Sequence, residues 1–263
     1  MAEHPSLEDR LRTNYNETGV AVMQALYSDD YLSIGGTEST RELAARAAVA
    51  GTSRVLDVGC GIGGPALWLA GEIGCTVEGV DLVPSSIAEA SQRALARGLA
   101  DKATFREADA LALPFDDGSF DVVWGQDAWC HVPDKAGLLS EARRVLRPGG
   151  TIAFTDWLRG TGMEPHARQA ALEAALSPLA ASADEYERML ADAGFATPHV
   201  EDIGATFVDQ YRTVCARLDH DRDDLIERFG VRVYEIVREI NTTILHGFEQ
   251  GGIGGGRCVA TAR

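Results

Sequence analysis

Several features that would place this chain in a membrane or outside the cell are missing from its sequence. No uninterrupted apolar stretch is long enough to cross a bilayer, and the segment MAEHPSLEDR lacks the basic and then apolar pattern of a signal peptide. The five cysteines are odd in number and scattered, without a C-x-x-C pair. This usage excludes a disulfide framework and a cysteine-based zinc site. We therefore expect a cytoplasmic protein with reduced thiols.

Positive charge is also scarce. Lysine and arginine together number 24 against 40 aspartates and glutamates, which gives a net charge of −16. Such a balance argues against binding to nucleic acid or to an anionic membrane, so a small-molecule substrate is the expected partner; the oligomeric state stays open. Only two lysines occur, Lys102 and Lys135, beside many arginines. This bias is typical of a GC-rich genome, with a salt-adapted surface as the alternative.

What the sequence does contain is a glycine-rich motif, VLDVGCGIGG, at residues 55–64. Its apolar run ends in Asp57, closely spaced glycines follow, and helix-forming sequence begins directly afterwards. A buried parallel strand that runs through glycines into a helix lets a ligand approach the backbone, because no Cβ stands in the way. A second apolar strand, residues 76–80, ends in Asp81, where a carboxylate suits the two hydroxyls of a ribose.

The spacing of the motif indicates which ligand it binds. The glycines follow G-x-G-x-G-G and not the G-x-G-x-x-G of dinucleotide sites, and Asp57 precedes the first of them by two residues. A carboxylate there would repel a pyrophosphate and attract an ammonium group. The motif therefore predicts S-adenosylmethionine, with a plain tight turn as the alternative. Because no cluster of His, Cys and Asp has the spacing of metal ligands, we expect no metal.

Strand and helix patterns alternate along the first part of the chain. Strands are expected at residues 54–59, 76–82, 104–108, 120–126 and 151–157, with helices at 64–73, 84–98 and 135–147 between them. This alternation predicts an α/β fold with a doubly wound, mostly parallel, Rossmann-like sheet of seven strands and right-handed crossovers. The apolar content of 45% suffices for one large core with a small cap.

The remaining segments predict a helical cap over the carboxyl edge of the sheet, where α/β proteins bind ligands. Helices are expected at 5–14, 17–28, 164–181 and 207–248, a helix–strand unit at 184–193 and 196–203, and a last strand at 257–262, antiparallel at the sheet edge. Residues 147–150 (RPGG) predict a helix stop and turn, and residues 251–256 (GGIGGG) predict a hairpin turn rather than a phosphate loop. We expect one domain over 1–263, with a lid (1–36), a cofactor-binding core (37–157) and a substrate cap with terminal strands (158–263).

Over residues 31–157 the chain resembles the class I S-adenosylmethionine-dependent methyltransferases, through VLDVGCGIGG, VEGVDLVPSSI, READALALPFDDGSFDVVW and RVLRPGGTIAFTDW. Within that group it is similar to the phosphoethanolamine and the sarcosine/dimethylglycine N-methyltransferases, through NYNETG at 14–19, YLSIGG at 31–36 and QDAWCH at 126–131. The resemblance implies that Asp57, Gly59 and Gly61 line the methionine part of the cofactor, that Asp81 and Leu82 hold its ribose, and that Asp109 and Ala110 contact its adenine. It also implies that Ser33 and Gly36 close the loop over the cofactor and that Tyr31 and Gln126 complete the site.

The reaction constrains the residues on the acceptor side. Methyl transfer from a sulfonium is an in-line displacement that needs a free lone pair on the acceptor, whereas an alkylamine is protonated near neutral pH. His131 follows the fourth strand, at the carboxyl edge of the sheet. In the N-methyltransferases that the chain resembles, a tyrosine of the N-terminal helix and this histidine cover the site, which implies catalytic roles for Tyr15 and His131, with packing and a surface position as the respective alternatives. Asp127 is a candidate to hold the acceptor nitrogen or to cap the local turn.

The sequence says less about the acceptor itself. The phosphoethanolamine enzymes hold a phosphate with an arginine, a tyrosine and a lysine, but residues 174–179 (AALSPL) contain neither of the first two and residues 241–250 contain no lysine. A buried phosphate without charged donors is unfavourable, so an acceptor with a phosphate is not expected. Trp157 replaces a tyrosine of those enzymes, and its indole is a candidate to face an N-methylated cation or to cap the pocket. Candidates to pair a substrate carboxylate are Arg159, Tyr211, Arg212 and Arg257.

Three functions stay open at this point. The first is N-methylation of a small amine or amino acid such as sarcosine or dimethylglycine. The second is O- or C-methylation of a natural product, in which His131 would remove a proton from a hydroxyl or an activated carbon. The third is a cofactor-binding protein without catalysis, against which the intact glycine loop and the histidine argue.

Overall fold

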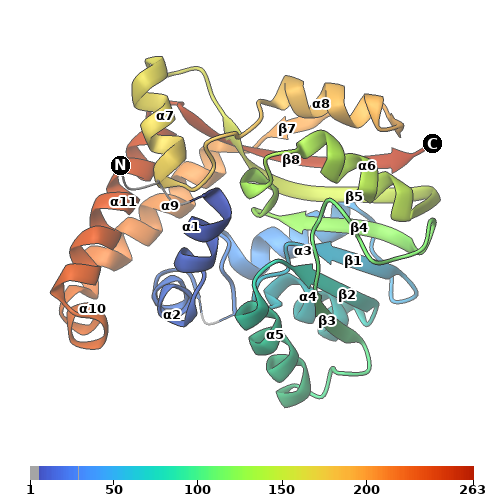
Figure 1. Cartoon of the computed structure of the whole chain (residues 1–263), viewed down its shortest axis with the longest axis horizontal. Coiled ribbons are helices and arrows are strands. Elements are labelled where there is room, and N and C mark those ends of the chain that lie inside the picture. The colour runs from blue at the N-terminus through green and yellow to red at the C-terminus, as the bar shows by residue number, and fades with distance from the viewer. Residues whose placement is uncertain (1–5, 29) are drawn as a thin grey trace.

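The computed structural model of the chain describes residues 6–28 and 30–263, so residue 5 of the expected first helix lies outside the described residues. A central sheet with helices on both faces organises the molecule (Figure 1). Five parallel strands form the larger part of this sheet, in the spatial order β3 (Ala103–Glu107), β2 (Thr76–Asp81), β1 (Arg54–Val58), β4 (Phe120–Gln126) and β5 (Leu146–Arg159). The strand order reverses between β1 and β4, which is where open α/β sheets bind ligands. The doubly wound, mostly parallel α/β fold is confirmed.

The remaining three strands pair antiparallel. β8 (Ile253–Ala262) pairs with β5 along one side and with two short strands, β6 (Phe195–Ala196) and β7 (Val200–Asp202), along the other. The described residues therefore form eight strands instead of seven, because the expected strand at 196–203 is interrupted at Thr197, whose backbone is left-handed (φ 39°). The expectation of an edge position for the last strand is wrong, since β8 lies inside the sheet.

The GGIGGG run belongs mainly to this inner strand and does not form the expected hairpin turn. Gly254–Gly256 pair with residues 156–158 of β5. A Cβ at Gly255 would lie only 2.7 Å from Cγ of Phe207, and one at Gly256 would lie 2.7 Å from Cδ1 of Leu158. Glycine is used here because neighbouring side chains pack directly against the strand backbone.

The RPGG segment is also part of a strand. β5 begins at Leu146, which pairs with Phe120 of β4, and the pairing then resumes with Thr151 opposite Val122. The segment that we expect to be a turn is thus a bulge inside β5. Gly149 accommodates this bulge with a left-handed backbone (φ 75°).

Two sets of helices cover the faces of the sheet. On one face, α6 (Lys135–Val145) and α8 (Ala183–Asp192) bury their apolar side chains against the strands. On the other face lie α3 (Gly36–Arg46), α4 (Gly64–Trp68) and α5 (Pro84–Ala96). The expected helix at 64–73 changes to a wider π turn at Leu69–Ile73. The sequence pattern does not predict α3, which begins without a side-chain cap after a left-handed Gly35 (φ 83°).

The remaining helices form a cap with its own apolar core. They are α1 (Leu7–Asn14), α2 (Glu17–Leu26), α7 (Pro165–Ala174), α9 (Gly204–His220), α10 (Arg222–Phe229) and α11 (Val231–Glu249). α7 ends well before residue 181, because Leu176 adopts a left-handed backbone (φ 54°). The expected helix at 207–248 is divided into three, with Gly230 (φ 85°) between α10 and α11. Across the described ranges, no helix is long and apolar enough to cross a bilayer.

Candidate active site

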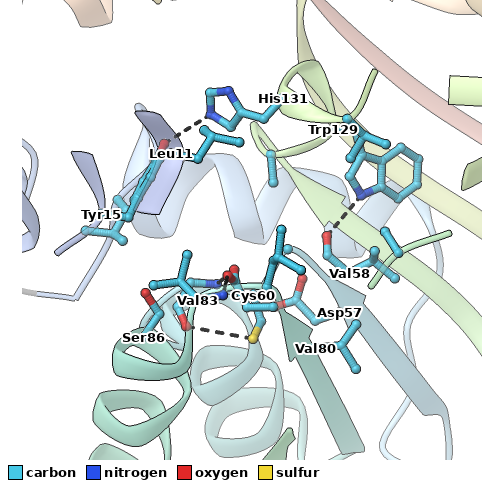
Figure 2. Close-up of a pocket in the computed structure, with 18 of the residues that line it drawn as sticks. Leu11, Tyr15, Asp57, Val58, Cys60, Val80, Val83, Ser86, Trp129 and His131 are labelled. Carbon is cyan, nitrogen blue, oxygen red and sulfur yellow. Dashed lines mark hydrogen bonds between the residues drawn. The ribbon is translucent and has the colours of Figure 1, made fainter. Parts of the chain in front are cut away.

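A cavity of 340 Å³ lies at the carboxyl ends of β1, β2 and β4, and helix α1 contributes to its wall (Figure 2). The glycine loop after β1 forms its floor, and the loops after β2, β3 and β4 form its sides. Most of the predicted site residues line it, namely Tyr15, Ser33, Asp57, Gly59, Gly61, Asp81, Leu82, Asp109, Ala110, Gln126, Asp127 and His131. The structure therefore brings together residues that span more than a hundred positions of sequence.

The glycine loop is shaped by backbone that other residues rarely adopt. Gly59 and Gly61 are both left-handed, with φ of 80° and 51°. A Cβ at Gly59 would lie 2.6 Å from Cβ of Ala128, so a side chain at this position would displace the loop after β4. The amides of Gly59 and Cys60 donate to the carbonyl of Val80 at 2.8 and 3.0 Å, which ties the loop to the end of β2. The result is a bare backbone surface against which a ligand can lie.

Two acids flank this surface. Asp57 is 1% exposed, and its Oδ2 atom has no hydrogen-bond partner among the described residues. Burial, together with the nearby charge of Asp81, raises the pKa of Asp57 to about 8. Asp81 accepts hydrogen bonds from the amides of Gly61 and Val83, each at 2.9 Å. Burial raises the pKa of Asp81, and these amides oppose the rise. Asp81 thus orders the glycine loop, a role that the sequence pattern does not reveal.

Gln126 links the end of β4 to the loop in front of α3. Its Nε2 donates to Oγ of Ser33 at 3.3 Å, and its Oε1 accepts from Oγ1 of Thr40 at 2.9 Å. Two other residues predicted for the cofactor, Tyr31 and Gly36, are not among the residues that line the cavity. Tyr31 is buried, and its ring lies 3.8 Å from the position of a Cβ at Gly36. The structure places these two behind the cavity wall, where they support the loop.

Tyr15 and His131 face each other on the side of the cavity opposite the glycine loop (Figure 2). The Tyr15 hydroxyl lies 3.1 Å from Nε2 of His131, and Nδ1 of His131 lies 3.0 Å from the carbonyl oxygen of Leu176. A carbonyl only accepts, so Nδ1 carries the proton and donates, and Nε2 of the neutral ring accepts from the tyrosine. Burial lowers the pKa of His131 and raises that of Tyr15 well above its usual range, which keeps both groups uncharged. The predicted pairing of the two side chains is present in the structure.

Asp127 lies beside this pair in a left-handed backbone conformation (φ 55°). Its Oδ1 accepts from Oγ1 of Thr155 at 2.7 Å, whereas its Oδ2 is buried and has no partner among the described residues. Burial raises the pKa of Asp127 to about 8. A strained residue with an unpaired carboxylate oxygen at a cavity wall is typical of a ligand-binding position.

The comparisons with known proteins agree with this geometry. A model of the methyltransferase domain family matches residues 56–154. The 27-O-demethylrifamycin SV methyltransferase of Amycolatopsis mediterranei is 30% identical to the chain, over 76% of the chain and 75% of the relative. The chain belongs to the S-adenosylmethionine-dependent methyltransferases.

Two further relatives of this methyltransferase are phosphoethanolamine N-methyltransferases. Phosphoethanolamine N-methyltransferase 1 of Zea mays is 29% identical, over 84% of the chain and 44% of the maize protein. The structure of a phosphoethanolamine N-methyltransferase 2 from Haemonchus contortus, in complex with phosphomonomethylethanolamine and S-adenosylhomocysteine, superposes with a TM-score of 0.90 at 25% identity, over 98% of the chain and 60% of the nematode chain. The chain thus spans less than two thirds of the length of several relatives that it matches.

The residues of the cavity suit S-adenosylmethionine, the cofactor of this methyltransferase. The unpaired oxygen of Asp57 offers a partner to the ammonium of the methionine part, and Gly59 leaves space where a Cβ would stand. Asp81 keeps lone pairs for ribose hydroxyls, because each of its oxygens accepts one amide. Among the described residues, no three His, Cys, Asp or Glu side chains are gathered as a metal site requires.

Two predicted substrate residues, Trp157 and Tyr211, do not line the cavity. They pack with Phe248 in the core of the cap, with ring centroids 5.2 Å apart for Trp157 and Phe248 and 5.4 Å apart for Tyr211 and Phe248. The Tyr211 hydroxyl donates to Asn241 at 2.7 Å. The indole nitrogen of Trp157 is buried and has no partner among the described residues.

The arginines considered for a substrate carboxylate are paired elsewhere. Arg159 contacts Glu185 at 2.5 Å, and Arg212 contacts Glu249 at 2.9 Å. Arg257 contacts Glu42 at 2.7 Å and Glu201 at 3.0 Å. None of these arginines lines the cavity, so the structure gives no support to their expected role.

Sequence reasoning missed other parts of the wall. Leu7 and Leu11 of α1 close the cavity with apolar side chains. The indole nitrogen of Trp129 donates to the carbonyl of Val58 at 2.9 Å and so joins the loop after β4 to β1. The apolar residues at positions 7 and 11 lie one helical turn apart on the expected first helix, and this spacing is the sequence signal for Leu7 and Leu11. The carbonyl of Leu176 that orients His131 has no side-chain signature at all.

Proposed function

We propose that this methyltransferase acts on the nitrogen of a small amine or amino acid, such as sarcosine or dimethylglycine. The observation that carries the proposal is the uncharged Tyr15–His131 pair at the cavity wall, next to the unpaired oxygen of Asp127. When bound, S-adenosylmethionine supplies a methyl group activated by its sulfonium. The protein must then position an acceptor nitrogen in line with that methyl and dispose of its proton.

Asp127 is suited to position the acceptor. A carboxylate oxygen that is buried without a partner gains strongly from a charge-assisted hydrogen bond with an ammonium N–H. Burial raises the pKa of Asp127 to about 8, and the positive charge of an arriving ammonium would lower that pKa and so favour the ionised carboxylate. The acceptor would therefore enter as a cation held by Asp127.

The Tyr15–His131 pair is suited to remove the proton. The Tyr15 hydroxyl hydrogen points to Nε2 of His131, so the lone pairs of its oxygen are free to face an ammonium N–H. As the tyrosine oxygen takes a proton from the acceptor, its own proton passes to Nε2. The resulting imidazolium keeps its Nδ1–H on the Leu176 carbonyl. The tyrosine remains neutral throughout, in keeping with its strongly raised pKa.

The acceptor that we propose carries no phosphate. The nematode relative binds phosphomonomethylethanolamine, which presents a dianion. Here Arg159, Arg212 and Arg257 are committed to acids, and residues 174–179 contain neither arginine nor tyrosine. Of the described residues that line the cavity, Arg12 is the single arginine and none is a lysine, whereas a buried dianion needs several charged donors.

Transfer of a radiolabelled methyl group to a panel of acceptors tests the proposal. Glycine, sarcosine, dimethylglycine, ethanolamine, phosphoethanolamine and a set of phenols and sugars would each be incubated with the enzyme, and product mass spectra would locate the methyl. We expect N-methylated products from the amines or amino acids, formed much more slowly by the His131→Ala variant. Efficient methylation of phosphoethanolamine would refute the exclusion of phosphate, and an absence of any N-methylation would refute the proposal.

O-methylation of a natural product is a second candidate. The match to the 27-O-demethylrifamycin SV methyltransferase covers three quarters of that relative, and the name of the relative places the methyl group on oxygen. In that reaction the neutral Nε2 of His131 would take the proton of a hydroxyl through Tyr15. Methylation of phenols or sugars alone in the same panel would establish this alternative, and C-methylated products would be recognised by mass spectrometry in the same way.

A further inference from the structure

His131 does its work only if its ring is held in one orientation and one tautomer. Its two ring nitrogens contact the hydroxyl of Tyr15 and the carbonyl of Leu176. These partners lie on different segments, and the loop that carries Leu176 is strained at φ 54°. Something must therefore fix the backbone of His131 relative to the loop at residues 175–182.

Lys135 makes that connection. It is the first residue of α6, and only 4% of it is exposed. Its ammonium donates to the carbonyl of Val132 at 2.8 Å and to the carbonyl of Leu179 at 3.0 Å. Val132 directly follows His131, and Leu179 lies in the same loop as Leu176. One buried ammonium thus joins the backbone beside the histidine to the loop that orients its ring.

Asp156 of β5 holds the other side of the histidine. It is fully buried, and its Oδ1 accepts from the amide of Cys130 at 2.9 Å, the residue that directly precedes His131. Its Oδ2 accepts from the hydroxyl of Tyr186 at 2.6 Å, which comes from α8. The backbone of His131 is therefore bound on both sides by buried charged side chains.

The two charges also attract each other. Burial lowers the pKa of Lys135, and the charge of Asp156 opposes that shift. Burial raises the pKa of Asp156, and the Tyr186 hydroxyl and Lys135 oppose that rise. Buried charges contribute little net stability, because their desolvation offsets their attraction, so a stabilising role alone does not account for this pair.

We propose that Lys135 and Asp156 are positioning residues that hold His131 in the orientation and the Nδ1–H tautomer in which Nε2 faces Tyr15. They act through backbone groups, and neither of them lines the cavity. The inference rests on the proposed function, since it assigns the pair a role in setting a histidine that takes part in proton removal.

The chain offers a matched control for the lysine. Lys102 is the only other lysine, and its ammonium also donates to a backbone carbonyl, that of Gly74, at 3.0 Å. Lys135→Met keeps the length of the side chain and removes the ammonium. We expect this variant to lose about tenfold to a hundredfold in kcat with the Kd of S-adenosylmethionine unchanged, because a misplaced group near the reaction lowers the rate on this scale. Lys102→Met should retain the kcat of the unmodified enzyme.

A spectroscopic signature separates positioning from simple stability. In protein with ¹⁵N-labelled histidine, the nitrogen shifts of His131 report which ring nitrogen carries the proton. We expect the Nδ1–H tautomer in the unmodified enzyme and in Lys102→Met, and a mixture of tautomers in Lys135→Met. A lower Tm with unchanged tautomer and unchanged kcat would show a merely structural lysine and overturn the proposal.

Asp156→Asn provides the second variant. It preserves the volume and the acceptor for the Cys130 amide but removes the charge, and we expect the same loss of kcat and the same mixture of tautomers. If neither variant folds, the nitrogen shifts of His131 in the unmodified enzyme still test the proposal, because an Nε2–H tautomer there would refute it. Full activity of His131→Ala would instead refute the proposed function. The tautomer measurement does not depend on activity, so the two failures are distinguishable.

Discussion

The two sides of the cavity are built in different ways. On the cofactor side, Asp57, the glycine loop and Asp81 come from one continuous stretch along β1 and β2, and the predicted residues Ser33, Asp109 and Gln126 join them from other segments. The acceptor side joins Tyr15, His131 and Leu176, whose contacts cross 116 and 45 positions of sequence. The first is fixed by local backbone and the second by packing of the cap on the sheet. Substitutions on the first side should therefore change affinity for the cofactor, and those on the second should change turnover.

The largest expected effect is on the acceptor side. His131→Ala should lower kcat by about 10²- to 10⁴-fold if the ring accepts the proton, whereas the Kd of S-adenosylmethionine should stay the same. Tyr15→Phe should behave alike, and the double variant should be little worse than either single one, because the two groups act as a unit. Steady-state kinetics and calorimetry give the two constants.

The matched control for this experiment is His199→Ala. The His199 ring also contacts a carboxylate, that of Glu187, at 3.0 Å, but its side chain is 80% exposed. Full activity of the Tyr15 and His131 double variant would remove the pair from the reaction. An equal loss in cofactor affinity and in turnover would abolish the division between the two sides.

The next effect concerns the cofactor side. Asp81→Ala should weaken binding of S-adenosylmethionine by about 1.5–3 kcal/mol, because a charged acceptor for ribose hydroxyls is lost and the Gly61 amide loses its partner. Calorimetric titration measures the change. Glu78→Ala, on the same strand, removes an acid that pairs with Arg54 and Arg106 and should leave the Kd unchanged. An unaltered affinity in Asp81→Ala would place the ribose elsewhere.

A smaller effect is expected at Asp127, on the acceptor side. Asp127→Asn keeps an oxygen for the hydroxyl of Thr155 but loses the carboxylate that we propose to hold the acceptor nitrogen. The KM of the amine should rise about tenfold, with cofactor affinity unchanged, since a hydrogen bond between charged groups becomes a neutral one. Initial rates over a range of acceptor concentrations test this. An unchanged KM would mean that the acceptor does not reach this carboxylate.

The last effect is on stability and not on function, and it is a dependence of Tm on pH. The pKa of Asp57 is raised from 3.8 to about 8, so the folded chain keeps a proton that the unfolded chain releases. The contribution of this proton to the free energy of unfolding is complete below the pKa of Asp57 in the unfolded chain. It is lost as the pH rises through the pKa in the folded chain, by at most about 1.4 kcal/mol per pH unit. Without cofactor, Tm should therefore fall between pH 6 and pH 8 more steeply than in Asp57→Asn. Parallel thermal melts of both proteins check this, and identical slopes would contradict it.

The same contrast explains what the sequence could predict. The parallel strands, the glycine loop and the acids at positions 57 and 81 follow from local apolar runs and glycines, and the structure has them at the expected places. The pairing of Tyr15 with His131 came from a resemblance, because no local pattern joins residues so far apart. The Leu176 carbonyl was not predictable, since every residue has a carbonyl. The sequence predicts that Trp157 and Tyr211 contact the substrate, but both side chains pack in the apolar core of the cap.

The position of β8 has a consequence for how the chain is made. β8 follows every other strand in sequence, yet it is the strand that joins β5 to β6 and β7. When β5 leaves the ribosome, the backbone amides and carbonyls along one of its edges have no partner strand. They stay unpaired while the cap helices α7, α9, α10 and α11 are translated. Open strand edges recruit other chains, so the nascent protein passes through a stage at which aggregation competes with folding. We therefore expect the yield of folded enzyme in a cell to fall when translation between β5 and β8 is slowed, which pulse-labelling of soluble and aggregated chains would measure.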